Sequence, residues 1–414
     1  MMTNKILRIK TADKRYELPA GAGSDSMHHD PQYSYAVTVL ELASGDFGTG
    51  LSYSLGRGNE VVIKAIEAYA PFVVGRDLRE IMGDFAGFWR SLADESQLRW
   101  IGPHKGAIHM ALASISCALV DAWCRLKGLP LWQVLLEMRP EELIRWVDLR
   151  YLEDFISRDE ALGLLAEAYP SDWRKHALIA EGYPAYNTSV GWLNYDIDQL
   201  LANCRREVEA GFDALKLKVG SPDIGADVRR LRAVRDAVGP HVRIMTDANQ
   251  RWSVPDAIKA GKALAALDCY WLEEPTHPDD VIGYQQIARE VSPLRLASGE
   301  CISNAVLFKN LIRTGGIYFV QADVLRLGGL PEWLAVAIMA KKAGVPLIPH
   351  ASDMGQMHQH LVFWQAIGLG REPWYLEYIP HLREQFVAPA EVRQGRYLPP
   401  KLPGASTRLV NVAP

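Results

Sequence analysis

The chain has 414 residues, which is long enough for a large barrel and a second lobe. Its net charge is −4 and its basic residues are scattered, which argues against nucleic acid or a membrane surface as a partner. The N-terminus lacks an apolar signal core, no uninterrupted apolar run reaches membrane length, and the five cysteines form no CxxC pair. We therefore expect a cytoplasmic protein with reduced cysteines.

The first part of the chain predicts an α+β lobe with an antiparallel sheet. Residues 5–19, 33–42 and 48–54 have the composition of strands. Two helices are expected next, over residues 60–74 and 106–127, because their apolar residues recur at three- and four-residue spacing. A Gly-Leu-Pro stop signal ends the second helix.

After a stretch without a clear pattern at residues 139–182, short apolar strands alternate with amphipathic helices. The strand candidates are residues 185–189, 214–219, 242–247, 270–273, 294–297, 318–323, 345–349 and 374–377. Eight strands with helices between most of them predict a TIM-like barrel in the α/β class. A doubly wound open sheet is the alternative, but it usually carries a Gly-rich nucleotide turn, and no such motif is present.

These patterns predict two domains. We expect the α+β domain to span residues 1–150 and the barrel to span residues 151–380. The Pro-rich tail, residues 381–414, is expected to return to the first lobe.

An ionisable residue ends each of seven successive strand candidates. These residues are Lys218, Asp247, Glu273, Glu300, Asp323, His350 and Glu377. Their spacings of 29, 26, 27, 23, 27 and 27 residues match the length of one βα unit. Catalytic groups of such barrels lie at the C-terminal ends of the strands, and polar groups gathered there are costly to bury without a ligand. This series is therefore the predicted functional site.

The motif ALKLKVG predicts a catalytic base. Lys216 and Lys218 point to the same side of a strand, and in a barrel that side is the lumen. Two neighbouring ammonium groups lower each other's pKa, which would make one of them a usable base near neutral pH. An edge strand with a solvated lysine face is the alternative.

Three consecutive strand ends carry carboxylates that could share a cation. Their mutual repulsion requires a positive charge, and all-oxygen ligation favours Mg²⁺ over zinc. The three positions are Asp247, Glu273 and Glu300. Only one of the adjacent Glu273 and Glu274 can face the lumen, and alternation alone does not decide which. Surface acids in salt bridges are the alternative.

The last two strand ends and the next helix carry further candidates. Asp323 and His350 end adjacent strands, so Asp323 could hold one imidazole nitrogen while the other faces a substrate. Glu377 could hydrogen-bond an oxyanion, position His350 or be purely structural. For His358 and His360 we favour a solvated helix start over a metal site.

The motifs KLK, TDAN, WLEEP, SGE and the Asp–His pair resemble the enolase superfamily, in its mandelate racemase branch. Longer segments, among them GSDSMHHDPQYSYA, GYPAYNTS, DANQRW and GRYLPPKLPG, are similar to L-fuconate dehydratases. The resemblance implies an N-terminal capping lobe on a (β/α)7β barrel and one Mg²⁺ per subunit. It implies Asp247, Glu273 and Glu300 as metal ligands, Lys218 as base tuned by Lys216, and His350 as acid supported by Asp323.

The implied reaction is that of a hydro-lyase. Lys218 would remove the C2 proton of a sugar acid to give a metal-stabilised enediolate, and His350 would assist loss of the 3-hydroxyl. L-fuconate is the first substrate expected, although the segment at 351–361 departs from the Gly-rich loop of the fuconate enzymes. The alternatives are another aldonate or aldarate, a racemase or epimerase, and a catalytically silent family member.

We also expect the partners to be a small sugar acid and further copies of the same chain in a homo-oligomer. Substrate contacts are expected from Asn249, Asp25, Met27 and Trp100. His28 and His29 of the same early loop could close over a pocket, with a plain surface loop as the alternative, and ordinary packing is the alternative for Trp100.

Overall fold

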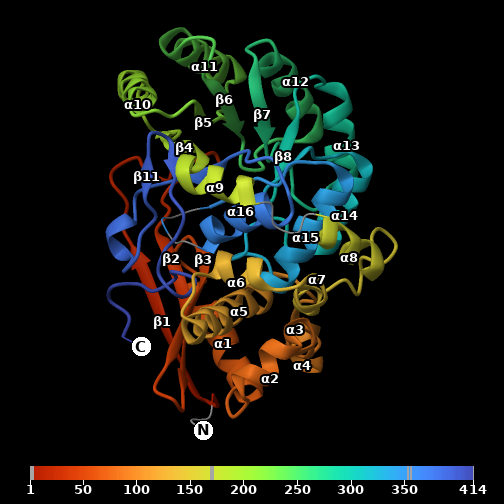
Figure 1. Cartoon of the computed structure of the whole chain (residues 1–414). Coiled ribbons are helices and arrows are strands. Elements are labelled where there is room, and N and C mark those ends of the chain that lie inside the picture. Colours follow the sequence, from red (N-terminus) through yellow and green to blue (C-terminus); the bar gives the residue numbers. More distant parts are fainter. Residues whose placement is uncertain (1–3, 168–171, 352–353, 355–356, 414) are drawn as a thin grey trace.

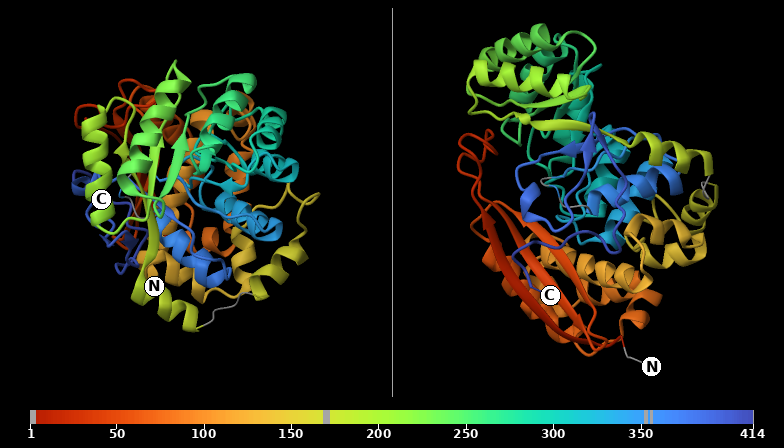
Figure 2. Two further views of the ribbon diagram at one scale, coloured as in Figure 1. Left: turned by 90° about the horizontal axis from the view of Figure 1, so that it is seen from above. Right: turned by 60° about the vertical axis from the view of Figure 1, so that its left-hand side comes forward.

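The computed structural model describes residues 4–167, 172–351, 354 and 357–413. An α+β lobe and a parallel β/α barrel lie against each other, with the barrel in the upper half of Figure 1. Figure 2 shows the N-terminal sheet as a separate layer beside the barrel. This is the predicted architecture.

The N-terminal lobe is built on a three-stranded antiparallel sheet. Its order is β1 (Ile6–Tyr16), β2 (Tyr33–Leu42), β3 (Phe47–Ser54), and the three strands lie where the sequence predicted them. Helices α1 (Asn59–Val73) and α5 (Gly106–Lys127) follow the expected bounds closely. The shorter helices are α2 (Leu78–Gly83), α3 (Phe85–Ala93), α4 (Ser96–Ile101), α6 (Leu131–Glu137), α7 (Pro140–Leu143) and the 3₁₀ turn η1 (Ile144–Trp146).

Helix α5 lies unusually close to β3, because two glycines of that strand face it. A Cβ atom at Gly48 would be 2.1 Å from the carbonyl oxygen of Ala118, and one at Gly50 would be 1.9 Å from that of Ser114. The helix is long and apolar enough to cross a membrane, but 78% of its most apolar window is buried, as in a core helix.

The barrel alternates strands and helices in the (β/α)7β order. Its strands are β4 (Tyr183–Gly191), β5 (Ala214–Lys218), β6 (Arg243–Asp247), β7 (Cys269–Glu273), β8 (Leu296–Ser298), β9 (Phe319–Val320) and β10 (Leu376–Tyr378). Its helices are α10 (Ile197–Glu209), α11 (Ile224–Val238), α12 (Val254–Ala265), α13 (Val281–Glu290), α14 (Ala305–Thr314), α15 (Leu330–Ala343) and α16 (Met357–Gly368). Neighbouring strands from β4 to β9 pair in parallel, and β10 pairs back onto β4.

The predicted seventh strand, residues 345–349, is reduced to a parallel bridge between Val320 and Leu347. Val320 donates to the carbonyl of Pro346, and Ile348 donates to the carbonyl of Val320. Pro346 and Pro349 have no backbone N–H, which prevents a longer hydrogen-bonded ladder.

The described part of the stretch at 139–182, which showed no clear pattern in the sequence, contains three α-helices besides the 3₁₀ turn η1. These are α7, α8 (Arg158–Glu167) and α9 (Asp172–Glu181). In α8 only Ala161 and Leu165 are buried, so its apolar stripe is too thin to predict a helix from periodicity.

The C-terminal tail contacts both lobes. A short hairpin of β11 (Val392–Arg393) and β12 (Arg396–Tyr397) follows the 3₁₀ turn η2 (Arg383–Gln385) and pairs with β4. Further on, the Ala405 N–H donates to Asp121 of α5. The tail therefore lies beside the N-terminal sheet, as Figure 1 shows, while domain boundaries at residues 150 and 380 stay a prediction.

Candidate active site

The barrel lumen is filled in two layers, one apolar and one polar. Each of the eight strand positions supplies one buried side chain to the apolar layer, namely Tyr186, Ala214, Met245, Trp271, Ala297, Phe319, Ile348 and Tyr375. Because side chains alternate along a strand, positions two residues further on face the lumen again, nearer its mouth. These positions are Thr188, Lys216, Asp247, Glu273, Gly299, Gln321, His350 and Glu377.

Two carboxylates of the polar layer and the neighbouring Glu300 lie close enough to share one cation. One oxygen each of Asp247, Glu273 and Glu300 lies within 4.8 Å of the others. Two of them are fully buried, and Glu300 is partly exposed. The sequence prediction that these three residues meet is confirmed, and three oxygen donors with room for further ligands fit Mg²⁺.

Contacts with Trp271 decide which of Glu273 and Glu274 faces the barrel lumen, and the residue is Glu273. The Trp271 indole and the Gln321 amide both donate to Glu273 Oε2, at 3.1 and 2.8 Å. Burial and the charge of Asp247 raise the pKa of Glu273 to about 8. The Lys216 ammonium lowers this pKa, so the carboxyl needs a further cation beside it to stay ionised at neutral pH. Glu274 has a φ of 42°, so the alternation of side chains along the strand ends at this residue. Glu274 is buried as well.

The two lysines of β5 form ion pairs with buried carboxylates at the barrel mouth. Lys216 Nζ lies 2.7 Å from Glu273 and 2.8 Å from Glu377, while Lys218 Nζ lies 2.6 Å from Asp247. The predicted lowering of the Lys218 pKa is wrong for this structure. Burial and Lys216 do lower it, but the charges of Asp247 and other carboxylates outweigh them and raise it.

On the other side of the cluster, His350 is held by an acidic partner. Its Nδ1 lies 2.8 Å from Asp323, and its Nε2 lies 3.1 Å from Glu300. Burial lowers the pKa of His350, but Glu300, Glu377 and Asp323 raise it to about 9. The imidazole is therefore a cation at neutral pH, with a proton to donate.

His358 and His360 are not at a solvated helix start, contrary to the sequence prediction, since both are buried in α16. His358 Nε2 lies 2.8 Å from Asp323, which thus joins two imidazoles. In the sequence, the apolar residues before and after this pair of histidines indicate that the segment is buried. His360 accepts a hydrogen bond from the Trp132 backbone, away from the cleft.

Glu377 contacts residues from several strand positions at the barrel mouth. It accepts hydrogen bonds from Thr188 Oγ1 at 2.5 Å and from the Ala351 N–H at 3.2 Å. Burial raises its pKa, but Lys216 and His350 lower it by more. As a carboxylate it cannot donate to an oxyanion, so a positioning role for Lys216 and His350 fits the structure better.

A cleft opens over this cluster, between the barrel mouth and the N-terminal lobe. Its lining includes Lys218, His350 and Glu300 from the barrel, and Asp25, His28, Tyr33 and Tyr53 from the lobe. Asn249 also lines it and donates to Glu300 at 3.4 Å.

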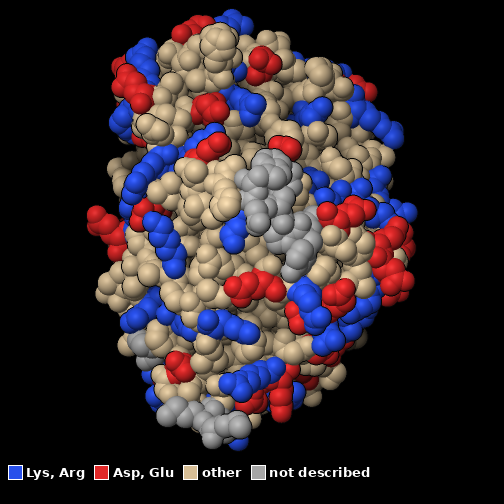
Figure 3. Space-filling model, in the orientation of Figure 1, with Lys and Arg blue, Asp and Glu red and all other residues tan. Residues whose placement is uncertain are grey.

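On the face shown in Figure 3, acidic and basic residues are interspersed among the described residues, without a continuous basic area.

Two predicted substrate contacts are not brought to the cleft. Trp100 is 90% exposed at the end of α4, and Met27 is 49% exposed beside Asp25. Several lining residues were not among the predicted substrate contacts, and two of them are His28 and Arg326. His28 pairs with Asp25, and Arg326 donates to the carbonyl of Glu300, a tertiary contact that has no local sequence signal. Residues 352–353 and 355–356 of the 351–361 segment lie outside the described residues.

Comparison with known proteins places this geometry in a family. Residues 199–411 match the family described as enolase C-terminal domain-like. The crystal structure of human mitochondrial enolase superfamily member 1 is 39% identical and superposes with a TM-score of 0.95, covering 99% of this chain and 95% of that one. The chain belongs to the enolase superfamily. The predicted membership is thereby confirmed.

Two further members of the superfamily carry names that state a reaction. L-galactonate dehydratase of Hypocrea jecorina is 39% identical, over 94% of this chain and 88% of the relative. L-talarate/galactarate dehydratase from Salmonella typhimurium LT2, solved with Mg and L-lyxarohydroxamate, is 26% identical with a TM-score of 0.78. That match covers 99% of this chain and 92% of the Salmonella chain.

Proposed function

We propose that the protein is a Mg²⁺-dependent acid-sugar dehydratase, with aldonates of the L-galacto configuration as its substrates. The observation that carries the proposal is the placement of two proton-handling groups on either flank of the carboxylate cluster. Lys218 contacts Asp247 on one flank, and His350 contacts Glu300 on the other. Both groups line the same cleft.

Asp247, Glu273 and Glu300 would hold the Mg²⁺ ion. When bound, the ion would neutralise the carboxylate group of a sugar acid and the negative charge that develops as the C2 proton leaves. With Asp247 engaged in metal binding, its attraction for the Lys218 proton would weaken. The Lys216 ammonium, which lowers the pKa of Lys218, would then favour the neutral amine that a base requires.

Lys218 would take the C2 proton, and protonated His350 would donate its Nε2 proton to the departing 3-hydroxyl. Water leaves, and the enol product tautomerises to a 2-keto-3-deoxy acid. Asp323 and His358 keep the His350 ring oriented through Nδ1. Each proton transfer of this kind contributes about 10²–10⁴-fold to the rate.

Two lines of support converge on the substrate class. Sequence motifs are similar to L-fuconate dehydratases, and one relative is named L-galactonate dehydratase. L-fuconate is the 6-deoxy form of L-galactonate, so both acids present the same stereochemistry from C2 to C5. A cleft that contacts the substrate from C2 to C5 would therefore accept both acids.

The test is a panel of sugar acids with Mg²⁺ and detection of keto acid. L-fuconate and L-galactonate should turn over at comparable rates and faster than galactarate. Turnover of galactarate alone would contradict the configuration assigned here. The two flanking groups also suit an epimerase, and in D₂O an epimerase would exchange the C2 proton of these acids without forming keto acid.

A further inference from the structure

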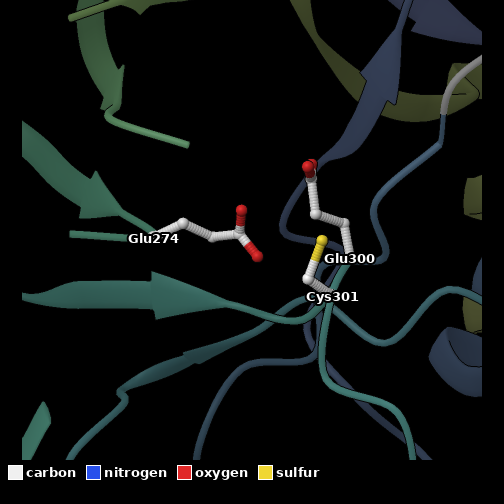
Figure 4. Close-up of side chains that lie close together, drawn as sticks. All are labelled: Glu274, Glu300 and Cys301. Carbon is white, nitrogen blue, oxygen red and sulfur yellow. The ribbon is translucent and has the colours of Figure 1, made fainter. Parts of the chain in front are cut away.

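A second group of metal-ligating side chains lies beside the carboxylate cluster. One ligand atom each of Glu274, Glu300 and Cys301 lies within 4.8 Å of the others. Figure 4 shows the Glu274 carboxylate extending from the end of β7 toward Glu300 and Cys301. Glu300 belongs to both groups, whereas Glu274 and Cys301 have no part in the proposed dehydration.

Glu274 has an oxygen that nothing in the described structure satisfies. Its side chain is fully buried, and the Gln250 amide donates to Oε2 at 2.8 Å. Its Oε1 is buried and has no hydrogen-bond partner among the described residues. A buried carboxylate oxygen without a partner costs about 1–3 kcal/mol or more, so this position is suited to a ligand that the protein atoms do not supply.

Cys301 adds a sulfur ligand to this group, which the carboxylate cluster lacks. Of the five cysteines, the other four are buried, while Cys301 is partly exposed and lines the cleft with Glu300. The cleft therefore leads a cation to this residue. A sulfur donor favours zinc-class cations and disfavours Mg²⁺, which prefers oxygen.

We propose that Glu274, Glu300 and Cys301 form a second cation site, which binds a thiophilic divalent ion such as Zn²⁺. One thiolate and two carboxylates supply three donors, and water from the cleft supplies the fourth. As the sulfur–metal bond forms, the thiol proton leaves to the buffer. If the proposed function holds, a zinc-class ion here shares Glu300 with Mg²⁺ and inhibits turnover.

The experiment titrates the full-length protein with Cd²⁺ at saturating Mg²⁺ and records the thiolate-to-metal charge-transfer absorption. We expect one equivalent to produce the band, and calorimetry in two buffers of different ionisation enthalpy to show release of at least one proton, that of the Cys301 thiol. Cys301→Ser should abolish the band, while Cys204→Ser, a matched change at a buried cysteine, should leave it intact. Glu274→Gln should weaken Cd²⁺ binding by about tenfold or more, equivalent to 1.4 kcal/mol.

Circular dichroism of each variant checks that it is folded. A band that persists in Cys301→Ser, or no band in the wild-type protein, would overturn the proposal. In the second case Glu274 would be a protonated acid hydrogen-bonded to Glu300. Because the readout is absorption and proton release, neither result depends on dehydratase activity, so this proposal and the proposed function can fail separately.

Discussion

Replacing Lys216 by Met tests how the buried charges of the barrel mouth are balanced. The Lys216 side chain is 0% exposed, and its ammonium lies 2.7 Å from Glu273 and 2.8 Å from Glu377. Methionine fills a similar volume without the charge. The substitution leaves both carboxylates buried without their main cationic partner.

The expected loss of stability is about 3–5 kcal/mol at pH 7 without Mg²⁺, the range for removing one partner of a buried ion pair. A second argument gives a similar magnitude. Glu377 can escape its uncompensated charge by taking up a proton. Because an ordinary glutamate has a pKa of 4.5, doing so at pH 7 costs roughly 3 kcal/mol, at 1.36 kcal/mol per pH unit. The loss should therefore shrink as the pH falls to 5.

Denaturant unfolding of wild type and variant, with and without Mg²⁺, measures the effect. Lys262→Met is the matched control, because its ion pair with Glu290 has the same 2.7 Å separation but is about half exposed. The control should lose about 0–1 kcal/mol. Mg²⁺ should restore part of the stability lost by Lys216→Met. Equal losses in the two variants would refute the reasoning.

Three further predictions concern other parts of the structure. Asp323→Asn should lower turnover by at least about 10²-fold with unchanged Mg²⁺ affinity in calorimetry, because His350 loses its orienting partner; an unchanged rate would contradict this. Gly50→Ala should destabilise the protein by about 1–3 kcal/mol by overpacking against α5, whereas Gly163→Ala, with open space around it, should not. Burial lowers the pKa of His360 to about 3, so stability should fall by roughly 1.4 kcal/mol per pH unit below the unfolded pKa of about 6.5. Thermal melts should show a smaller fall in His360→Gln; an identical pH dependence would refute the assignment.

The barrel and its polar end were predictable because both depend on local repetition. Strand alternation and a βα repeat near 27 residues place Asp247, Glu300 and one of the adjacent Glu273 and Glu274 at one end of a parallel sheet. The N-terminal strands and α5 were likewise predictable from periodicity.

What the sequence did not give depends on distances between distant segments. The raised pKa of Lys218 follows from its 2.6 Å contact with Asp247, and strand order alone does not fix such a distance. The burial of His358 against Asp323, and the exposure of Trp100, depend on how helices pack on the barrel and on each other.

The most direct test of the central claim is proton NMR of L-fuconate in D₂O with Mg²⁺, comparing wild type, Lys218→Ala and His350→Ala. If Lys218 is the base and His350 the acid, His350→Ala should exchange the C2 proton for deuterium without forming keto acid, and Lys218→Ala should exchange nothing. Exchange by Lys218→Ala, or its absence only in His350→Ala, would contradict the assignment of the two groups.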